Sequence, residues 1–560
     1  DTYILDLENW DLPEDLIVEV NFETNFSGDH LDHSNPLNDK LINMENITLK
    51  GDFDSVMTGN DLDNVIITSG GDDELRGGDG NDVLVSGWGN DFIYGEGGDD
   101  VLVLTSGGTQ HFDGGEGTDK FEIYVPDWKA PDGFVGIVDL NTGRQGSASD
   151  PDNPLNDKLV SIENVTTVVQ YDYIINGNDT NNVLIGGSGN DTLSTGSGDD
   201  QLFGGLGDDI LIINGTGDSV LDGGEGVDTF KVDMSHYVPP QDDQNFTYLA
   251  NLSTGFAGSL NNPQHVNNDE LKNIENIEYT GSISAHLYGD EGDNLIIDGS
   301  GADRLYGGDG NDTLKSGAGA DEIYGEAGND TIILTEGKGG AGNQLFDGGE
   351  GNDTFRHEVT DLTSILAPPD YEQIIEINLV TGFVGQPKEY DGSPDYYIKN
   401  FQDTISNFEN VEFITSTDVK ITGDYKNNFI TSSSGNDKLY GGDGDDILKS
   451  GAGDDEVYGE GGNDTIIHNG SGTQYYDGGA GNDTYILDLE NWDFPEDFIV
   501  EVDLTTGFSG DHLNHSHPLN DTVVNIENIT LKGDVNSVMI GDGLDNIIKT
   551  LGGDDLIRAG

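Results

Sequence analysis

The hydrophobic positions of this 560-residue chain recur with a period of nine residues over five stretches. In the unit GGDGNDTLK, Gly307–Lys315, only Leu314 is apolar enough to point into a core. The first six residues, Gly-Gly-x-Gly-x-Asp, are typical of a turn, because glycine accepts positive φ values and allows close backbone approach. The last three residues, with an aliphatic residue in the middle, predict a very short β-strand.

Such units follow one another without a gap, as in Gly77–Val85 and Ser86–Tyr94, which is typical of a solenoid. Successive strands would face opposite ways, so two units, or eighteen residues, predict one flattened coil. The aliphatic residues of the coil would then meet in a thin core. The expected fold class is all-β.

The turns also predict a chemistry, because aspartate recurs at the sixth position of the unit among backbone carbonyl groups. Stacking would bring each such aspartate close to its counterpart in the next coil. Two carboxylates held this close repel each other unless a cation lies between them, and hard oxygen ligands suit Ca²⁺. The pairs expected on this basis include Asp73 with Asp91, Asp82 with Asp100, Asp303 with Asp321, and Asp437 with Asp455.

The unit G-G-x-G-x-D-x-U-x, in which U is aliphatic, resembles the calcium-binding nonapeptide repeat of RTX, or haemolysin-type, proteins. The resemblance implies a tandem right-handed parallel β-roll, or β-helix solenoid. It also implies that Ca²⁺ is bound by the sixth-position aspartates and turn carbonyls, several ions to each block, and that the chain leaves the cell unfolded by type I secretion. Large, secreted bacterial surface proteins with tandem repeats are the members of the family that this chain is most similar to.

The metal ligands implied by the resemblance all occupy the sixth position of a unit. They are Asp73, Asp82, Asp91, Asp100, Asp119, Asp191, Asp200, Asp209, Asp228, Asp303, Asp312, Asp321, Asp330, Asp353, Asp437, Asp446, Asp455, Asp464, Asp483 and Asp555. The first unit of each block has asparagine there instead, and a stretched unit such as Leu104–Asp113 precedes the last one, so these positions are not included. The asparagines are Asn64, Asn182, Asn294, Asn428 and Asn546.

A longer repeat lies above the short one. The opening sequence DTYILDLENWDLPEDLIVEV returns almost unchanged from Asp483 onward, and we expect the sequence to be a segment of a longer array. Blocks of nonapeptide units are predicted at 59–122, 177–231, 289–356 and 423–486, with a fifth block beginning at 541–560. Connectors are predicted at 1–58, 123–176, 232–288, 357–422 and 487–540.

The connectors share landmarks with one another. VDLNTG at Val138–Gly143 and SIENV at Ser161–Val165 return in related forms in later connectors. Alternating apolar residues such as Phe498, Val500 and Val502 predict strands instead of helices. We therefore expect the coil to continue through the connectors with a wider cross-section.

Composition adds a condition to this fold. Asp plus Glu number 108 against 22 Lys plus Arg, which gives a formal net charge of −86, and 83 residues are glycine. Such a chain is normally disordered, so the periodic pattern predicts a fold only when cations are present. Folding and calcium binding are then expected to be one event. The absence of cysteine fits a bacterial product that is secreted and acts outside the cell, at its surface.

Several classes of function are disfavoured. The sequence contains no G-x-S-x-G, H-E-x-x-H or G-x-x-x-x-G-K motif, so no enzyme activity, catalytic residue or organic cofactor is predicted. The negative charge argues against nucleic acid and anionic membranes as partners, and no apolar run approaches the roughly twenty residues that span a bilayer. Calcium is the predicted partner, while self-association and binding of a cell-surface polysaccharide stay open.

Two histidine clusters, Asp29–His33 and Asp511–His517, offer ligands of the kind that transition metals use. The other three connectors lack such a cluster. The pattern therefore favours a polar loop that was duplicated together with the large repeat.

The leading functional hypothesis is structural: a calcium-stiffened rod in a secreted bacterial surface protein, such as an adhesin stalk, an extracellular filament, a sheath or an S-layer. The near-identical long repeats motivate it, because interchangeable units add length to a chain without adding new chemistry. The alternative is the C-terminal accessory and secretion region of a type I-secreted enzyme or toxin, whose catalytic domain would lie outside this chain.

Overall fold

The computed structural model describes residues 1–8, 10, 16–31, 39–126, 128–150, 156–237, 246–261, 268–335, 343–358, 374–385, 402–492, 494–495, 498–513 and 520–560. These residues form two compact units, Asp1–Asp233 with Leu249–Glu278, and Met234–Tyr248 with Tyr279–Gly560. Strands and turns make up both units, and no helix occurs in the described ranges, so the all-β prediction is confirmed. None of the described segments is thus a helix that could cross a membrane.

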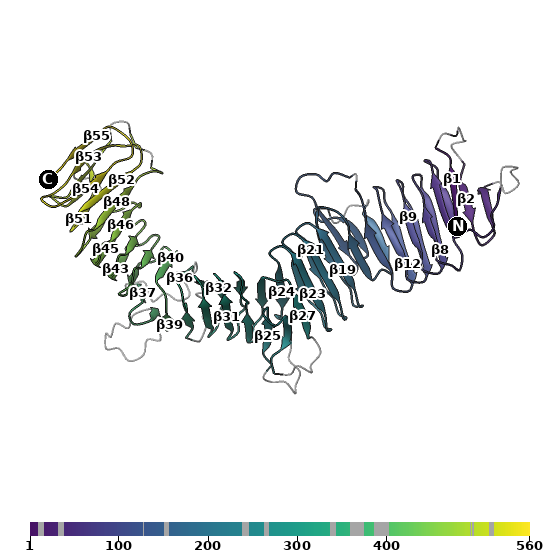
Figure 1. Cartoon of the computed structure of the whole chain (residues 1–560), viewed down its shortest axis with the longest axis horizontal. Coiled ribbons are helices and arrows are strands. Elements are labelled where there is room, and N and C mark those ends of the chain that lie inside the picture. Colours follow the sequence, from purple (N-terminus) through teal and green to yellow (C-terminus); the bar gives the residue numbers. More distant parts are fainter. Residues whose placement is uncertain are drawn as a thin grey trace. The chain divides into compact units, whose positions relative to one another are not determined.

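The first unit consists of two sheets of short strands, stacked in sequence order (Figure 1). One sheet contains β1 (Thr2–Asp6), β5 (Asn46–Lys50), β7 (Val65–Ile67), β9 (Val83–Ser86), β11 (Val101–Leu104), β13 (Lys120–Ile123), β17 (Asn164–Thr167), β19 (Val183–Ser188), β21 (Gln201–Leu206), β23 (Val220–Glu225), β26 (Phe256–Ser259) and β27 (Asp269–Lys272). The other contains β2 (Val18–Asn21), β3 (Phe26–Asp29), β4 (Asp39–Lys40), β6 (Ser55–Thr58), β8 (Asp73–Asp79), β10 (Phe92–Gly97), β12 (His111–Glu116), β14 (Val135–Asp139), β15 (Arg144–Ser147), β16 (Asp157–Val160), β18 (Asp172–Asn176), β20 (Thr192–Ser194), β22 (Ile210–Ile213) and β24 (Thr229–Asp233). Two further strands, β25 (Tyr248–Asn251) and β28 (Asn276–Thr280), include residues of both units.

The second unit is built in the same way (Figure 1). One sheet contains β29 (Ala285–Tyr288), β31 (Arg304–Asp309), β33 (Glu322–Ala327), β35 (Leu345–Asp347), β37 (Ile375–Asn378), β38 (Phe383–Gly385), β39 (Gln402–Ser406), β41 (Val419–Thr422), β43 (Lys438–Asp443), β45 (Glu456–Gly461), β47 (Tyr475–Asp477), β49 (Ile499–Asp503), β50 (Phe508–Asp511), β51 (Asp521–Val524), β53 (Asn536–Ile540) and β55 (Asp555–Arg558). The other contains β30 (Leu295–Ile297), β32 (Thr313–Ser316), β34 (Thr331–Leu334), β36 (Thr354–His357), β40 (Asn410–Phe413), β42 (Phe429–Thr431), β44 (Ile447–Lys449), β46 (Thr465–His468), β48 (Thr484–Asp488), β52 (Asn528–Lys532) and β54 (Ile547–Lys549).

Strand register confirms the eighteen-residue coil. Val83 in β9 pairs in parallel with Val65 on one side and with Val101 on the other, one coil away in each direction. The second sheet has the same step, since Leu75 of β8 pairs with Ile93 of β10. The solenoid predicted from the nine-residue period is therefore present in the described blocks.

The core lies between the two sheets and is thin, because most of the short strands contribute only one or two inward side chains. Leu314 is fully buried, as the sequence predicts, while Thr313 and Lys315 on either side of it are partly exposed. Larger rings fill the core next to the connectors, where Phe112 and Phe121 pack against each other at a tilt of 60°, with ring centroids 4.9 Å apart. Burial of one aliphatic residue per nonapeptide unit stabilises the fold by only about 2 kcal/mol. Repulsion between the charged turns could therefore outweigh the stabilisation by the core.

The connectors widen the coil, as expected, by inserting antiparallel strands. After β12 the chain forms β14, β15 and β16, and β15 runs antiparallel between its two neighbours. His111 of β12 pairs with Lys158 of β16, so this coil is 47 residues long before the parallel stacking resumes. The sequence predicted strands here, but it did not predict that some of them would be antiparallel.

Candidate metal sites

The sixth-position aspartates of successive coils stack into rows that run along each compact unit. Asp100 Oδ1 accepts a hydrogen bond of 2.7 Å from the backbone N–H of Asp82, which lies 18 residues earlier. Asp82 Oδ1 in turn accepts the N–H of Asn64 at 2.7 Å, and Asp119 Oδ1 accepts the N–H of Asp100 at 2.8 Å. We call such a row a carboxylate ladder, because each carboxylate is a rung that holds the preceding turn in register.

The four pairs named from the sequence are adjacent on these ladders. Asp91 Oδ1 accepts the N–H of Asp73, and Asp321 Oδ1 accepts the N–H of Asp303, both at 2.9 Å. Asp455 Oδ1 accepts the N–H of Asp437 at 2.9 Å. Stacking therefore brings the predicted aspartates together, whereas their role as metal ligands stays a prediction.

All but one of the twenty predicted aspartates are buried. Nineteen are almost completely buried, namely Asp73, Asp82, Asp91, Asp100, Asp119, Asp191, Asp200, Asp209, Asp228, Asp303, Asp312, Asp321, Asp330, Asp353, Asp437, Asp446, Asp455, Asp464 and Asp483. The exception is Asp555, which is exposed and accepts a hydrogen bond of 2.6 Å from the Ser537 hydroxyl group. Asp555 thus differs from the buried rungs in its exposure, whereas Asp73 accepts the same kind of hydrogen bond, from the Ser55 hydroxyl group at 2.7 Å.

Nonapeptide units that begin with glycine form a ladder that we call the glycine ladder. In this ladder the second carboxylate oxygen, Oδ2, has no hydrogen-bond donor. These rungs are Asp82, Asp100, Asp119, Asp191, Asp209, Asp228, Asp312, Asp330, Asp353, Asp446, Asp464 and Asp483. In each of them Oδ2 is buried and accepts no hydrogen bond from the protein. A buried carboxylate oxygen without a donor is costly, so each of these atoms calls for a positive partner.

The space beside each such oxygen is shaped by glycine. A Cβ atom placed on Gly77 would lie 2.0 Å from Asp82 Oδ2 and 2.7 Å from the Gly95 carbonyl oxygen of the next coil. Gly307 shows the same relation to Asp312 Oδ2, at 2.2 Å, and to the Gly325 carbonyl oxygen, at 2.6 Å. A carboxylate oxygen and a carbonyl oxygen thus meet where no side chain fits, and oxygen donors of this kind suit Ca²⁺.

Burial and neighbouring charge raise the pKa values of these carboxyl groups. Burial is the largest cause in each case; it raises the pKa of Asp82 and Asp446 to about 7 and that of Asp191 to about 8. The next rung adds to the effect, since the charge of Asp100 raises the pKa of Asp82 and that of Asp464 raises the pKa of Asp446. The ion-free ladder therefore opposes ionisation, and a bound cation would reverse this.

The ladders end in residues of the connectors, which the sequence marked only as a repeated landmark. Glu163, from SIENV, accepts the N–H of Asp119 on Oε2 at 2.8 Å, as the next aspartate would. Three other glutamates of the same landmark do this for the last rung of their blocks: Glu275 for Asp228, Glu409 for Asp353 and Glu527 for Asp483. The recurring Glu-Asn pair was the available signal, but a role in the ladder could not be deduced from it without the register.

At the other end of each block, asparagine replaces the aspartate. Asn182 Nδ2 donates to the Glu163 carbonyl oxygen at 2.6 Å, and Asn428 Nδ2 donates to the Glu409 carbonyl oxygen at 2.9 Å. An amide group therefore supplies a donor where the buried rungs have none. This is consistent with leaving the asparagine positions out of the predicted metal ligands.

The other carboxylate ladder consists of units that begin with a residue other than glycine and includes Asp73 and Asp91. It continues into the connectors through residues that were not predicted. Asp157 Oδ1 accepts the N–H of Gln110 at 2.8 Å, and Asp403 Oδ1 accepts the N–H of Gln344 at 2.9 Å. Gln110 and Gln344 belong to the stretched units. In another stretched unit Gln474 Oε1 accepts the N–H of Asp455 at 2.9 Å, so an amide side chain takes the place of a carboxylate there. Burial raises the pKa of Asp157 to about 7.

The histidine clusters lie partly outside the described residues. Of their described members, His30 Nδ1 lies 2.9 Å from Glu19 Oε2, and His512 Nδ1 lies 2.8 Å from Glu501 Oε2. The duplicated sequence thus makes the same local contact in both copies. The repeated contact agrees with the interpretation of the histidine clusters as a duplicated polar loop.

The chain was compared with known protein families. The model of the RTX calcium-binding nonapeptide repeat matches residues 58–93, 89–110, 176–211, 215–231, 280–314, 288–322, 306–337, 338–356, 422–457 and 431–466. The chain contains RTX repeats. Its RTX repeats bind Ca²⁺, and the buried carboxylates of the ladders are consistent with several calcium sites. No curated protein matches the chain.

Within the RTX repeats, the residues present fit the ion. Carboxylate oxygens without donors, turn carbonyl groups and glycines that leave room are the donor set that Ca²⁺ takes in proteins. We therefore propose the nineteen buried aspartates as the carboxylate ligands, with the glycine ladder as the clearest case. An RTX repeat region is structural and not catalytic.

Proposed function

We propose that this chain is the calcium-binding structural region of a secreted bacterial surface protein, of the adhesin-stalk, filament, sheath or S-layer type. It would fold and stiffen when it meets Ca²⁺ outside the cell. The observation that carries the proposal is the row of buried carboxylates with unpartnered oxygens on the glycine ladder. Such a row, in a chain with a net charge of −86, is unfavourable without cations and favourable with them.

The repetition of whole elements supports a structural role. β1 and β48 have the same sequence, TYILD, and each pairs with a strand of sequence NITLK, β5 or β52. The repeated sequence therefore forms the same pair of coils in both units. At about 4.8 Å for each parallel step, eleven stacked strands such as β30 to β54 extend about 48 Å. Repeats of this kind increase the length of a protein in fixed increments.

Small-angle X-ray scattering on the whole chain tests this proposal. We expect Ca²⁺ to change the scattering from that of an expanded coil to that of a stiff, elongated particle, and Mg²⁺ to leave it unchanged. A compact globular particle in Ca²⁺ would contradict the structural role, because a globule cannot serve as a stalk or filament. The same experiment at several protein concentrations would detect self-association.

The alternative proposal is an accessory and secretion region of a type I-secreted enzyme or toxin. RTX repeat proteins are typically secreted by type I systems, which both proposals share. The extended reading frame separates them: further long repeats would favour the structural role, and a catalytic domain would favour the accessory role.

A second candidate function is binding of a neutral cell-surface polysaccharide, and an aromatic groove in the first unit favours it. The groove has a volume of about 740 Å³ and is lined by Trp88, Tyr124, Trp128, Lys129 and Phe134, among others. Trp88 and Tyr124 are 66% and 46% exposed, although large aromatic faces are normally covered. Exposed aromatic rings next to polar side chains can stack on sugar rings and hydrogen bond to their hydroxyl groups.

Tryptophan fluorescence during titration with soluble oligosaccharides tests this candidate. The variants W88A and W128A should lose any binding, whereas W10A, which removes another exposed tryptophan outside the groove, should retain it. Equal responses of all three variants would contradict a sugar site in the groove.

A further inference from the structure

Asp298 occupies a position that hydroxyl side chains hold in comparable units. It opens the unit 298–306, which contains Asp303 at its sixth position. The corresponding first residue is Ser316 one coil later and Ser432 in the next block. Asp298 is only 6% exposed, so the exchange places a third carboxyl group inside the solenoid.

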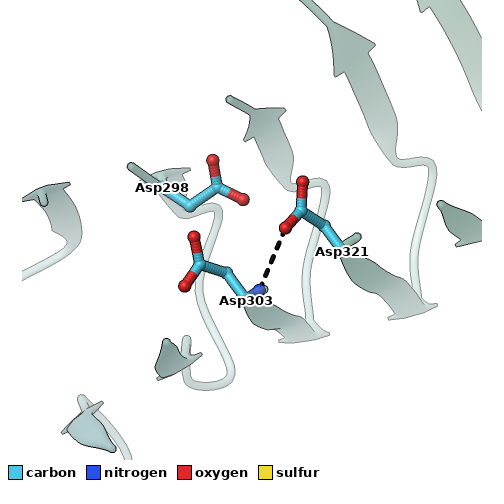
Figure 2. Close-up of side chains that lie close together, drawn as sticks. All are labelled: Asp298, Asp303 and Asp321. Carbon is cyan, nitrogen blue, oxygen red and sulfur yellow. Dashed lines mark hydrogen bonds between the residues drawn. The ribbon is translucent and has the colours of Figure 1, made fainter. Parts of the chain in front are cut away.

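The three aspartates of this region converge on one point. Asp298, Asp303 and Asp321 each provide a carboxylate oxygen, and these atoms all lie within 4.8 Å of one another. Figure 2 shows the three carboxyl groups facing a common space, with Asp321 one coil beyond the other two. Asp321 Oδ1 also accepts the N–H of Asp303 at 2.9 Å.

Two of these carboxylates have oxygens without a donor. Asp298 Oδ1 accepts the N–H of Gly317, and Asp303 Oδ1 accepts the N–H of Ala285, but Oδ2 of both residues is buried and accepts no hydrogen bond. One coil later, the Ser316 hydroxyl group donates to Asp321 Oδ2 at 3.3 Å. The exchange of a hydroxyl for a carboxylate therefore removes a donor from the unit of Asp303 and adds a negative charge.

No positive side chain compensates for this cluster in the described residues. Arg304, the nearest cation in sequence, forms an ion pair with Glu322 at 2.9 Å instead. Burial and the charges of Asp321 and Asp303 raise the pKa of Asp298 well above its ordinary value. Three buried acids that face one another thus need either protons or a cation between them.

We propose that Asp298, Asp303 and Asp321 form a three-carboxylate calcium site that binds the ion more tightly than the two-carboxylate positions of the ladders. The inference rests on the proposed function, since it singles out one site among those of the repeats. Calcium–oxygen distances of about 2.3–2.6 Å allow ligand atoms up to about 5 Å apart, so one ion can contact all three carboxylates. Affinity for Ca²⁺ rises with the number of charged ligands, and this site fills first as calcium is added.

Competition with a chromophoric calcium chelator measures the affinity classes of the whole chain. D298S restores the hydroxyl group of the comparable units and is expected to weaken the tightest site by at least about tenfold. D309S is the matched control, because it removes an exposed carboxylate of the same block that lies outside the cluster. The tightest site of D309S is expected to bind Ca²⁺ with the same affinity as that of the wild-type chain.

Two further variants keep the test independent of folding. D298N keeps the side-chain shape and offers an amide donor to the other two carboxylates, so the fold should persist in Ca²⁺ while the tightest site is lost. S432D places a third carboxyl group beside Asp437 and Asp455 in the next block, and it should add a second tight site. Far-UV circular dichroism in saturating Ca²⁺ reports the fold of each variant.

The outcomes separate this inference from the function on which it rests. A wild-type chain that binds no Ca²⁺ would overturn the proposed function. A wild-type chain that binds several ions, with D298S and D298N retaining the same tightest affinity as D309S, would overturn the three-carboxylate site alone. Loss of the tightest site in both Asp298 variants, with D309S unaffected, supports it.

Discussion

At the residue scale, each buried aspartate of the glycine ladder has two separate tasks. Oδ1 holds the register by accepting a backbone N–H from the preceding coil, as Asp446 does for Asn428 at 2.7 Å. Oδ2 has no donor and faces a turn that only glycine can form. The sixth-position aspartates and the Gly-rich turns were predictable from the nonapeptide period. The first task was not, because the sequence does not say which atom meets which N–H.

The glycine that opens a unit should tolerate no side chain. In G307A the added Cβ would lie 2.2 Å from Asp312 Oδ2, and we expect a loss of about 2–3 kcal/mol in the free energy of unfolding in Ca²⁺. G292A is the matched control in the same block, since its nearest neighbour, Asp290 Oδ1, would be 3.4 Å away. Urea unfolding in saturating Ca²⁺ compares the two, and equal midpoints would contradict a close-packed ion cradle.

Acid should act in opposite directions with and without calcium. The pKa of Asp82 is raised to about 7 in the ion-free fold, against about 3.9 for an unfolded aspartate, so the folded form binds more protons between these values. In chelator, lowering the pH from 8 to 5.5 should therefore favour the fold, visible as increased β signal in circular dichroism. In Ca²⁺ the same change should weaken ion binding, because protons compete for the carboxylates. A calcium midpoint that does not change with pH would argue against buried carboxylate ligands.

At the scale of elements, the connectors complete the ladders of the blocks. Their strands were predictable from alternating apolar residues such as Phe498, Val500 and Val502. The role of the Glu-Asn landmark was not, since it depends on hydrogen bonds between residues 44 to 56 positions apart. The antiparallel direction of β15 was not predicted either, because alternating apolar residues do not show how a strand is directed. Asp298 was missed for another reason: it stands at the first position of its unit, and the nonapeptide pattern marked only the sixth position as a ligand.

Removing the glutamate that ends a ladder should lower the free energy of unfolding more than removing a surface charge does. E163A leaves the buried N–H of Asp119 without its acceptor, and we expect a loss of about 1–2 kcal/mol in the free energy of unfolding. E122A, in the same compact unit, removes only a partly exposed ion pair with Lys120. This ion pair is expected to stabilise the fold by less than about 1 kcal/mol. Urea unfolding of both variants in Ca²⁺ provides the comparison. A larger loss in E122A would mean that the connector does not complete the ladder.

At the scale of the whole molecule, charge and core size together lead us to expect a fold that forms only with cations. The net charge of −86 makes the coils repel one another, and the thin core contains only one or two buried apolar residues from most strands. Each ion would remove repulsion between two coils and satisfy oxygens in both. Conditional folding stays a prediction from composition and period together, whereas neither the protein's partner nor the role of its exposed aromatic groove could be deduced from the repeat.

Far-UV circular dichroism during a calcium titration of the whole chain tests the central claim most directly, namely that folding and calcium binding are one event. The account predicts an expanded coil in chelator, a cooperative rise of β-structure as Ca²⁺ is added, and no such change with Mg²⁺. A β-rich spectrum already present in chelator, unchanged by Ca²⁺, would contradict it, because the buried carboxylate ladders would then be stable without cations.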